Sequence, residues 1–260
     1  MVADDLPREK QNARPGDREL LAVLHNLRDE GVIHRYILLS SIHGDRHDLS
    51  QKYFGARTSK VRDHRGVPRF GWVAGIEAAK TDYVVHFESD ILLYQASAYS
   101  WLEAGMALLA RQPASMFIAP LPGPPVADGR LRGQAIFPTT DDEGNFRFQT
   151  FSSRRFLVSK QRFLKLLPTR VCYTSIKRAG LMRLGLGNAL LPWEECVSRA
   201  LQGSEYYRIH LRCPQAWTLH CPEHSPGWVQ SLPNIISKVE KGQYPERQGG
   251  TMTLILQGLA

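Results

Sequence analysis

The sequence predicts an α/β fold with a mixed, mostly parallel central sheet that is flanked by helices. Apolar runs of strand length alternate with segments of helical spacing in the first half of the chain, and this alternation is typical of βαβ units. The chain has 260 residues, 43% of them hydrophobic and 22% charged, which fits one large globular domain, or one domain with a tail. We therefore expect a main domain over residues 1–220 and a C-terminal extension over 221–260 that packs on the domain or on a partner.

The first βαβ unit is expected at the N-terminus, where residues 1–6 predict a short strand. A helix is expected next, with Asp17 as its N-cap and Gly31 at its end. The continuous apolar run RYILLSS at 35–41 then predicts a strand in the middle of a parallel sheet, because such strands are buried on both faces. It finishes in a polar turn at 42–45, at the edge where ligands of such sheets collect.

The stretch TDYVVHFESDILLY at 81–94 is the one around which we expect the rest of the chain to be organised. The preceding segment 72–80 predicts a short helix, and YVVHF at 83–87 predicts a buried strand that ends in the acidic cluster Glu88–Asp90. Carboxylates at the end of an apolar strand are costly to desolvate, so a cation, most simply a hard divalent metal, should lie against them. A carboxylate pair that is solvated in a loop, or paired with an arginine, is the alternative.

The middle of the chain predicts a helix, a strand and a group of shorter strands. Ser97 is the expected cap of a helix that ends near Arg111, and a strand follows at 116–119 before a proline-rich loop. Weak alternation over residues 130–158 predicts shorter, partly antiparallel strands. The helix KQRFLKLL comes next, with Ser159 as its cap and Pro168 at its end.

The second half adds a basic loop, a helix that starts with acids, and two late histidines. Glycines and basic side chains interrupt residues 173–191, which we expect to form a mobile loop. The helix that follows carries Glu194 and Glu195 in its first turn, where acids suit the helix dipole whether or not they have another role. Strands are expected at 206–211 and 217–219. His220 and His224 follow, and Pro222 excludes a regular helix between them; both are candidate metal ligands, and satisfied structural histidines are the alternative.

The net charge of +8 is concentrated in residues 151–212, which contain 12 basic and 3 acidic side chains. An anionic partner should meet this segment, whether a nucleotide diphosphate, an acidic polymer or a membrane face, with a solvated basic surface as the alternative. No apolar run approaches the roughly 20 residues of a membrane span, and the N-terminus lacks the apolar segment of a signal peptide, so we expect a cytoplasmic protein. The cysteines show no CxxC spacing, and we expect reduced thiols at Cys172, Cys196, Cys213 and Cys221.

Taken together, these features resemble a GT-A fold glycosyltransferase, most closely the family-2 glycosyltransferases, over about residues 17–220. The resemblance is carried by RYILLSSIHGD, by GIEAAKTDYVVHFESD, which ends in a DxD-type metal motif, and by LPWEECVSRAL, which contains an ED-type motif with the catalytic base. The chain departs from the family pattern by having glutamate where the family usually has aspartate, in Glu88-Ser89-Asp90 and in Glu194-Glu195. The resemblance implies a Rossmann-like GT-A sheet.

The resemblance also implies an activity: transfer of a sugar from a nucleotide-diphosphate donor to an acceptor hydroxyl, with inversion of configuration. It implies that Asp90, with Glu88 nearby, holds Mn²⁺ or Mg²⁺ against the diphosphate. His220 or His224 would complete the metal shell, and imidazole would favour Mn²⁺. Glu195, or Glu194, would accept the proton of the attacking hydroxyl.

The remaining donor contacts follow from the same resemblance. Arg69, or a neighbour in the basic run, would add positive charge near the phosphates. Asp45 would face the nucleoside, and Ser89 would lie in the donor site beside Glu88.

Two other classes of function stay open. A nucleotidyltransferase can use a similar sheet, carboxylate and metal, but it usually carries a glycine-rich, lysine-containing phosphate loop, and PREKQNARPGD supplies a single glycine. A non-catalytic basic module that binds polyanions would need aromatic residues interleaved with the arginines and lysines of 151–212, and these are only partly present. We expect no nucleic-acid partner. Contact with a membrane surface and self-association stay open.

Overall fold

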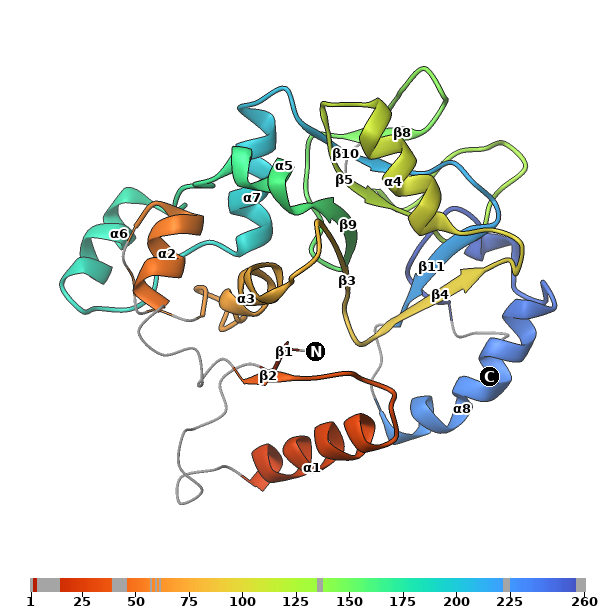
Figure 1. Ribbon diagram of the computed structural model, residues 1–260, viewed down its shortest axis with the longest axis horizontal. Helices are drawn as coiled ribbons and strands as arrows, with labels where there is room; N and C mark the ends of the chain where they lie inside the picture. The colour runs from red at the N-terminus through yellow and green to blue at the C-terminus, as the bar shows by residue number, and fades with distance from the viewer. Residues whose placement is uncertain are drawn as a thin grey trace. The chain divides into compact units, whose positions relative to one another are not determined.

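The computed structural model describes residues 2–3, 15–38, 46–56, 58, 60, 62–134, 138–221 and 225–255. The chain forms two compact units, whose elements are labelled in Figure 1. The first unit comprises Met1–Asp82 with Phe163–Ala200, and the second comprises Tyr83–Arg162 with Leu201–Ala260. The boundary that we predicted at residue 220 is therefore not a boundary between these units, because the residues on both sides of it belong to the second one.

The first unit begins with the strand, helix, strand order that the sequence predicts. β1 and β2 pair in parallel, with Val2 opposite Ile37 and Ala3 opposite Leu38. The helix between them contains Asp17 in its first turn, so Asp17 is not the cap residue that we predicted. These three elements are β1 (Val2–Ala3), α1 (Pro15–Asp29) and β2 (Ile37–Leu38).

Aromatic side chains form the core of the rest of the first unit. Phe54 and Phe70 meet edge to face with ring centroids 5.9 Å apart, and Trp72 stacks on Trp193 at 5.6 Å. Burial of such large rings contributes more apolar area per residue than any aliphatic side chain, so these contacts hold short helices together. The helices are α2 (Arg46–Phe54), α3 (Phe70–Ala78), α6 (Ile176–Arg183) and most of α5 (Lys160–Leu166) and α7 (Trp193–Gln202).

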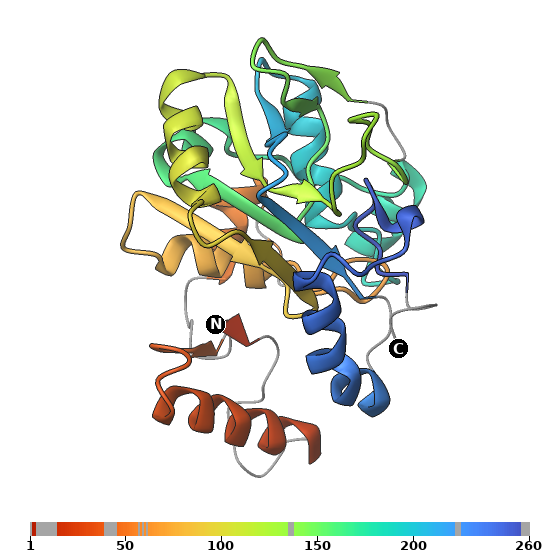
Figure 2. The same ribbon diagram turned by 90° about the vertical axis from the view of Figure 1, so that its right-hand side faces the viewer.

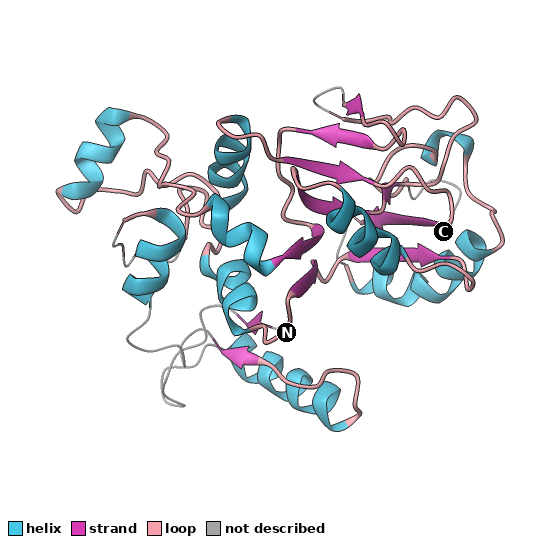
Figure 3. Cartoon of the chain, turned by 45° about the horizontal axis from the view of Figure 1, so that its top comes forward, coloured by secondary structure: helices cyan, strands magenta, loops and turns pink. Residues whose placement is uncertain are grey.

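A six-stranded sheet dominates the described part of the second unit, and its strands are among those drawn in magenta in Figure 3. Their order is β3, β9, β5, β10, β8, β7. Only β5 and β10 are parallel, and every other neighbouring pair in this sheet is antiparallel. The mostly parallel sheet that we predicted is therefore wrong at this level, although the α/β class is right. The strands are β3 (Tyr83–Phe87), β5 (Ser115–Ala119), β7 (Thr139–Thr140), β8 (Phe146–Phe148), β9 (Arg155–Ser159) and β10 (Tyr207–His210).

Two of the four antiparallel pairs are made by β9, which lies between β3 and β5 and runs against both. Val158 pairs with Val84 on one side and with Phe117 on the other, so β9 is buried on its two edges and on both faces. A strand in this place separates the two strands that a βαβ crossover would have made neighbours. The sequence shows that β9 is apolar but not where it inserts.

A three-stranded sheet in the order β4, β11, β6 completes the strands of the second unit. β4 (Ile91–Gln95) is antiparallel to β11 (Ala216–His220), and β6 (Leu121–Pro122) is parallel to it. The helix α8 (Pro226–Glu240), blue in Figure 2, buries Trp228, Ile235 and Val239 in the same apolar cluster as Trp217 and Leu219 of β11. The segment after residue 220 is thus built into the core of this unit.

The helix α4 (Trp101–Arg111) packs on the six-stranded sheet through a close contact at Gly105. Its cap is Ser100, whose hydroxyl accepts a hydrogen bond from the amide of Glu103, and not Ser97 as predicted. Leu108 and Leu109 of α4 share a buried cluster with Ile118 of β5, Leu157 of β9 and Ile209 of β10. A Cβ atom at Gly105 would lie 2.7 Å from a methyl carbon of Leu157, so glycine allows the helix to approach the sheet.

The interval that we predicted to be a mobile loop, 173–191, contains a helix instead. Ser175 accepts a hydrogen bond from the amide of Arg178, and this cap starts α6. The predicted α5 is confirmed, with Ser159 accepting from the amide of Arg162 at 3.4 Å. The four cysteines form no disulfide, as expected. In the part of the chain that the structure describes, no helix combines the length and the apolar character needed to cross a membrane.

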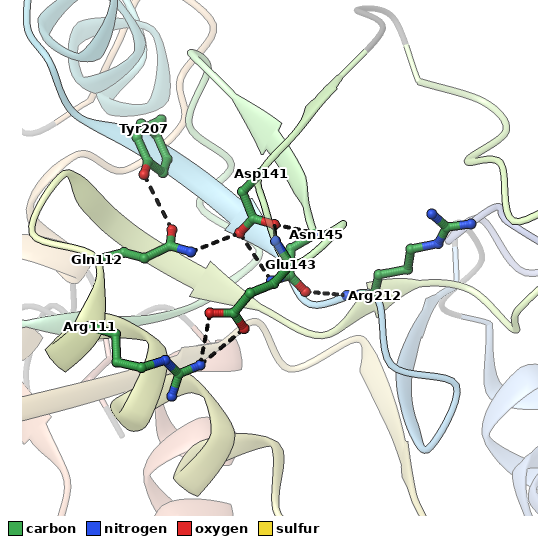
Figure 4. A network of polar contacts seen from close by, with 7 residues as sticks. All are labelled: Arg111, Gln112, Asp141, Glu143, Asn145, Tyr207 and Arg212. Atoms are coloured by element: carbon green, nitrogen blue, oxygen red, sulfur yellow. Dashed lines mark hydrogen bonds and ion pairs between the residues drawn. The ribbon is translucent and has the colours of Figure 1, made fainter.

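A polar network fastens the turn between β7 and β8 to the end of α4 (Figure 4). Asp141 accepts hydrogen bonds from the side chains of Gln112 and Asn145, both at 3.1 Å, and from the amide of Asn145 at 2.7 Å. Burial raises the pKa of the Asp141 carboxyl, but these hydrogen bonds outweigh burial and hold the pKa below its usual range. Arg111 and Glu143 add an exposed ion pair at 3.0 Å.

Replacing Gly105 by valine should weaken the packing of α4 on the sheet. The added Cβ would collide with Leu157 and press on Ile118, so we expect the free energy of unfolding to fall by about 2 kcal/mol. Gly180 is a matched control because it is also helical and no atom lies within 4 Å of where its Cβ would be; Gly180→Ala should stabilise by about 0.5–1 kcal/mol. Urea unfolding measures both. Equal stability of Gly105→Val and the unmodified protein would contradict the close contact.

Candidate active site

The acidic cluster after β3 forms a tight turn that leads directly into β4. The amide of Glu88 donates to the carbonyl of Arg154 at 2.9 Å, and the amide of Ile91 donates back to the carbonyl of Glu88 at 3.2 Å. Ser89, at the tip of the turn, is exposed, whereas Glu88 and Asp90 are half-buried. Each of these backbone bonds fixes the direction in which the next residue leaves the strand. The backbone that carries the carboxylates of Glu88 and Asp90 is therefore held by hydrogen bonds on both sides of the turn.

Asp90 and His220 meet at the end of β11. Oδ2 of Asp90 lies 3.2 Å from Nε2 of His220, and the two side chains are only 20% and 14% exposed. The pairing of Ile91 with His220 in the antiparallel ladder brings them together, and the amide of Cys221 lies 3.4 Å from the carbonyl oxygen of Asp90. Two predicted metal ligands that are distant in the sequence are thus neighbours in the fold.

A segment near the C-terminus holds the backbone of His220 on its other side. The amide of His220 donates to the carbonyl of Met252 at 2.8 Å, and the carbonyl of His220 accepts from the amide of Leu254 at 2.9 Å. This pair of bonds makes the residues from 252 to 254 a short parallel neighbour of β11. His220 is therefore clamped between β4 and this segment.

Gln248 holds that segment in its curved path. Its side chain is fully buried and donates to the carbonyls of Thr251 and Thr253, at 2.9 and 3.0 Å, while its oxygen accepts from the amide of Ile255 at 2.8 Å. One amide thus satisfies three backbone groups that no regular element would satisfy. Gln248 is the last residue of the short helix η2 (Glu246–Gln248). No sequence pattern singled it out.

The residues at the start of β9 lie beside the acidic turn. The hydroxyl of Ser153 donates to Oε1 of Glu88 at 3.3 Å, and Arg154 is half-buried on the same backbone. Arg155 is 2% exposed, pairs with Phe87 in the ladder, and reaches the sulfur of Met252 with its guanidinium. Burial, reinforced by repulsion from Arg208 and Arg154, lowers the pKa of Arg155 to about 9, so it stays cationic at neutral pH.

Two further basic side chains are buried on β10. The guanidinium of Arg208 lies over the ring of Phe148 at 4.5 Å. His210 is 2% exposed, and burial together with the charges of Arg208 and Arg155 lowers its pKa well below the usual value, so the imidazole is neutral. The basic excess that the sequence places in residues 151–212 therefore includes cations in the core of the second unit, close to the strands that carry the site.

The predicted catalytic bases lie on α7 in the first unit. Glu195 is exposed, and its Oε1 accepts a hydrogen bond from Nε of Arg199 at 3.0 Å, one helical turn later. Glu194 is half-buried beside Trp193, which is almost fully buried. Burial of that tryptophan against Trp72 fixes the start of the helix, so both glutamates stand in its first turn, as the sequence indicated.

Arg69, expected near the phosphates, is fully buried in the first unit. Its guanidinium lies over the ring of Phe54 at 4.2 Å and next to Cys196. A hydrogen bond from the Cys172 thiol, with the charge of Arg69, lowers the pKa of the Cys196 thiol to about 6, although burial opposes this. This conformation presents no exposed part of the Arg69 guanidinium to a phosphate.

Asp45 and His224 lie outside the described residues, so their expected contacts with the nucleoside and the metal remain predictions. The structure brings Asp90 together with His220 and sets Glu88 against Ser153 at the adjoining turn. Among the residues it describes, no three histidine, cysteine, aspartate or glutamate side chains converge as a complete metal-binding group. Asp90 and His220 are thus one oxygen and one nitrogen ligand that would need others from a ligand or solvent.

Comparison with models of known protein families finds no match, and comparison with curated proteins finds no significant relative.

Replacing Gln248 by alanine should loosen the segment that clamps His220. Three part-buried hydrogen bonds to backbone groups would be lost, and we expect the free energy of unfolding to fall by about 2–4 kcal/mol. The amide of Ile255, which donates to Gln248, should exchange its hydrogen faster in NMR exchange experiments. Gln230→Ala, on the exposed face of α8, is the matched control and should change stability by less than about 0.5 kcal/mol. Slow exchange at Ile255 in Gln248→Ala would show that the clamp does not depend on this amide.

Proposed function

We propose that this chain is a metal-dependent, inverting glycosyltransferase that moves a sugar from a nucleotide-diphosphate donor to an acceptor hydroxyl, on a variant of the GT-A fold. The observation that carries the proposal is the contact of Asp90 with His220 at 3.2 Å. These are the acid of the predicted metal motif and the late histidine, and the ladder between β4 and β11 brings them together. The order of sequence motifs supports the same assignment.

The chemistry of this pair fits a divalent cation that is shared with a diphosphate. Mg²⁺ is commonly held by one or two carboxylates together with substrate phosphates, and an imidazole ligand shifts the preference towards Mn²⁺. Asp90 would supply the carboxylate oxygen and His220 the imidazole nitrogen, leaving the other positions to phosphate oxygens and water. A cation bound there would stabilise the negative charge that develops on the diphosphate when the glycosidic bond breaks.

Positive side chains near the same turn would orient the donor. Arg154 is half-buried, and its carbonyl accepts a hydrogen bond from the amide of Glu88. The backbone of Arg154 is therefore next to the acidic turn. Arginine suits phosphate because its planar N–H groups can bind two oxygens at once. Because Arg69 is fully buried, we propose that Arg154 contacts the phosphates instead. The buried Arg155 adds charge from within the core of the same unit.

A glutamate on α7 would accept the proton of the acceptor. Glu195 is the first candidate, and Glu194 is the alternative. The carboxylate of Glu195 is exposed, and its ion pair with Arg199 lies at the surface. Such pairs contribute little, so the carboxylate can exchange partners at small cost. Removal of the proton makes the hydroxyl oxygen a stronger nucleophile, and attack opposite the leaving diphosphate inverts the anomeric carbon.

Replacing Asp90 by asparagine should abolish metal-dependent binding of the donor. Asparagine keeps the shape of the side chain but removes the charge that attracts the cation, so we expect at least a tenfold loss of affinity for the nucleoside diphosphate that binds best with Mn²⁺. Calorimetric titration with UDP, GDP and ADP, each with Mn²⁺ and with EDTA, measures this. Asp142→Asn, at an exposed position, is the matched control and should bind as the unmodified protein does. Unchanged binding by Asp90→Asn would remove the metal assignment.

Replacing Glu195 by glutamine should leave donor binding intact and slow the chemical step. Loss of a general base typically lowers the rate by 10²–10⁴-fold. The rate is measured as release of nucleoside diphosphate from a panel of nucleotide sugars, and Glu194→Gln is measured beside it to decide between the two acids. Glu205→Gln, at an exposed position, is the control. Full turnover by both Glu195→Gln and Glu194→Gln would retire the assignment of the base to α7.

A further inference from the structure

A second concave site lies in the second unit, away from the acidic turn. It is a cavity of about 230 Å³, and the proline-rich loop from Leu121 to Leu131 supplies most of its lining. The other walls come from Phe146 of β8, from Arg212 and Pro214 after β10, and from Gly250. None of Glu88, Asp90 and His220 lines it, so it is separate from the candidate metal ligands.

The charges at this cavity are all positive. Arg130 and Arg212 are its charged lining residues, both are exposed, and no carboxylate contributes to the lining. Within the described part of the chain, neither guanidinium forms an ion pair. The nearest acid in the loop, Asp128, is engaged elsewhere, because it accepts from the backbone amide of Arg130 at 2.9 Å and lies 3.8 Å from the guanidinium of Arg132. Two arginines from separate segments therefore line one small space, and no acidic residue among those described lines it.

Arg212 contacts residues of two other segments that line the cavity. Its backbone amide donates to Oδ1 of Asn145 at 2.9 Å, and its side chain extends away from the Asp141 network, as Figure 4 shows. The guanidinium lies over the ring of Phe146 at 5.6 Å. It also packs on Gly129, where a Cβ would lie 2.0 Å from Nη2, and this glycine has a φ of +64°. The absence of a Cβ at Gly129 thus leaves room for the Arg212 guanidinium at the cavity.

The size and charge of the cavity indicate its ligand. A volume of about 230 Å³ is below the range of roughly 300–1,000 Å³ that is usual for drug-sized ligands, and a monosaccharide derivative would fill it. Two guanidinium groups match the two negative charges of a phosphate monoester. Each guanidinium can donate two parallel N–H hydrogen bonds to phosphate oxygens. We propose that this cavity binds the phosphate monoester of a sugar-sized molecule, with Arg212 and Arg130 as its ligands.

The site does not depend on the proposed transferase activity. A phosphate monoester in this cavity could belong to a free small molecule or to the end of a longer phosphorylated chain, and the two share the same recognition chemistry. The cavity is linked to the metal ligands through the backbone, because Gly250 lines it and Met252, two residues later, accepts the amide of His220. Occupation of the cavity would thus fix the start of the segment that clamps His220.

Titration calorimetry of the full chain in EDTA and 150 mM salt tests the proposal without any contribution from a metal. The probes are glucose 6-phosphate, glucose, glucuronate and a phosphorylated oligosaccharide. We expect glucose 6-phosphate to bind at least tenfold more tightly than glucuronate, and glucose to show no binding. Equal or tighter binding of the phosphorylated oligosaccharide would identify a chain end as the source, whereas its exclusion would identify a free small molecule. No binding of either phosphorylated probe, or equal binding of glucose, would overturn the site.

Variants locate the binding in the cavity. Arg212→Met and Arg130→Met should each weaken glucose 6-phosphate at least tenfold, and Arg132→Met, whose guanidinium faces Asp128 outside the lining, should bind normally. Gly129→Ala should also weaken binding, because a Cβ there displaces Nη2 of Arg212. Asp90→Asn should bind the phosphorylated probe as the unmodified protein does, so failure of the transferase proposal and failure of this site give different results. Unchanged binding in both arginine variants would refute the assignment.

Discussion

The antiparallel pairing of β4 with β11 is the interaction on which the candidate active site depends. It sets Ile91 opposite His220, and Asp90, one residue earlier, then falls beside the imidazole. Because side chains alternate along a strand, a shift of one residue in this register would turn His220 to the other face and separate the pair. The register is also supported from the other side, since β6 and the segment at 252–254 both add to β11. A contact between residues distant in the sequence is thus fixed by four strand-like segments.

The elements of this fold could largely be predicted from local patterns, and their arrangement could not. The apolar run at β3, the serine cap of α5 and the acidic start of α7 each carry a signal within a few residues. The insertion of β9 between β3 and β5 has no such signal, because an apolar strand can pair with any neighbour. The same limit explains why a mixed sheet with one parallel pair was expected to be mostly parallel.

Two helices form in segments that are rich in glycine or proline. Glycines and basic residues suggested a loop at 173–191, yet the cap at Ser175 starts α6. The expected C-terminal extension contains the helix α8, which has Pro226 in its first turn, where no intrahelical N–H is needed, and it accommodates Pro233 further on. In both helices a local capping signal outweighed the general tendency of glycine and proline to end helices.

Some residues of the candidate site could be predicted from their type and position in the sequence, and others only from the folded structure. Asp90 could be chosen because a carboxylate at the end of an apolar strand is costly to desolvate without a cationic partner, and His220 because it follows a late predicted strand; the fold brings the two together. Arg155 stands in an apolar strand, which is a signal that a search for buried cations would have found. Gln248 has no signal of its own, because its partners are three main-chain groups whose positions depend on the whole loop.

That arrangement has a chemical consequence. Because every partner of the Gln248 side chain is main chain, the identities of residues 251, 253 and 255 can change without loss of these bonds, whereas the amide nitrogen cannot be replaced. Deamidation, which exchanges that nitrogen for a charged oxygen, would set a carboxylate against the carbonyl oxygens of Thr251 and Thr253 and push the strand-like segment away from His220. Deamidation of this single buried side chain would in this way alter the surroundings of His220, a candidate metal ligand.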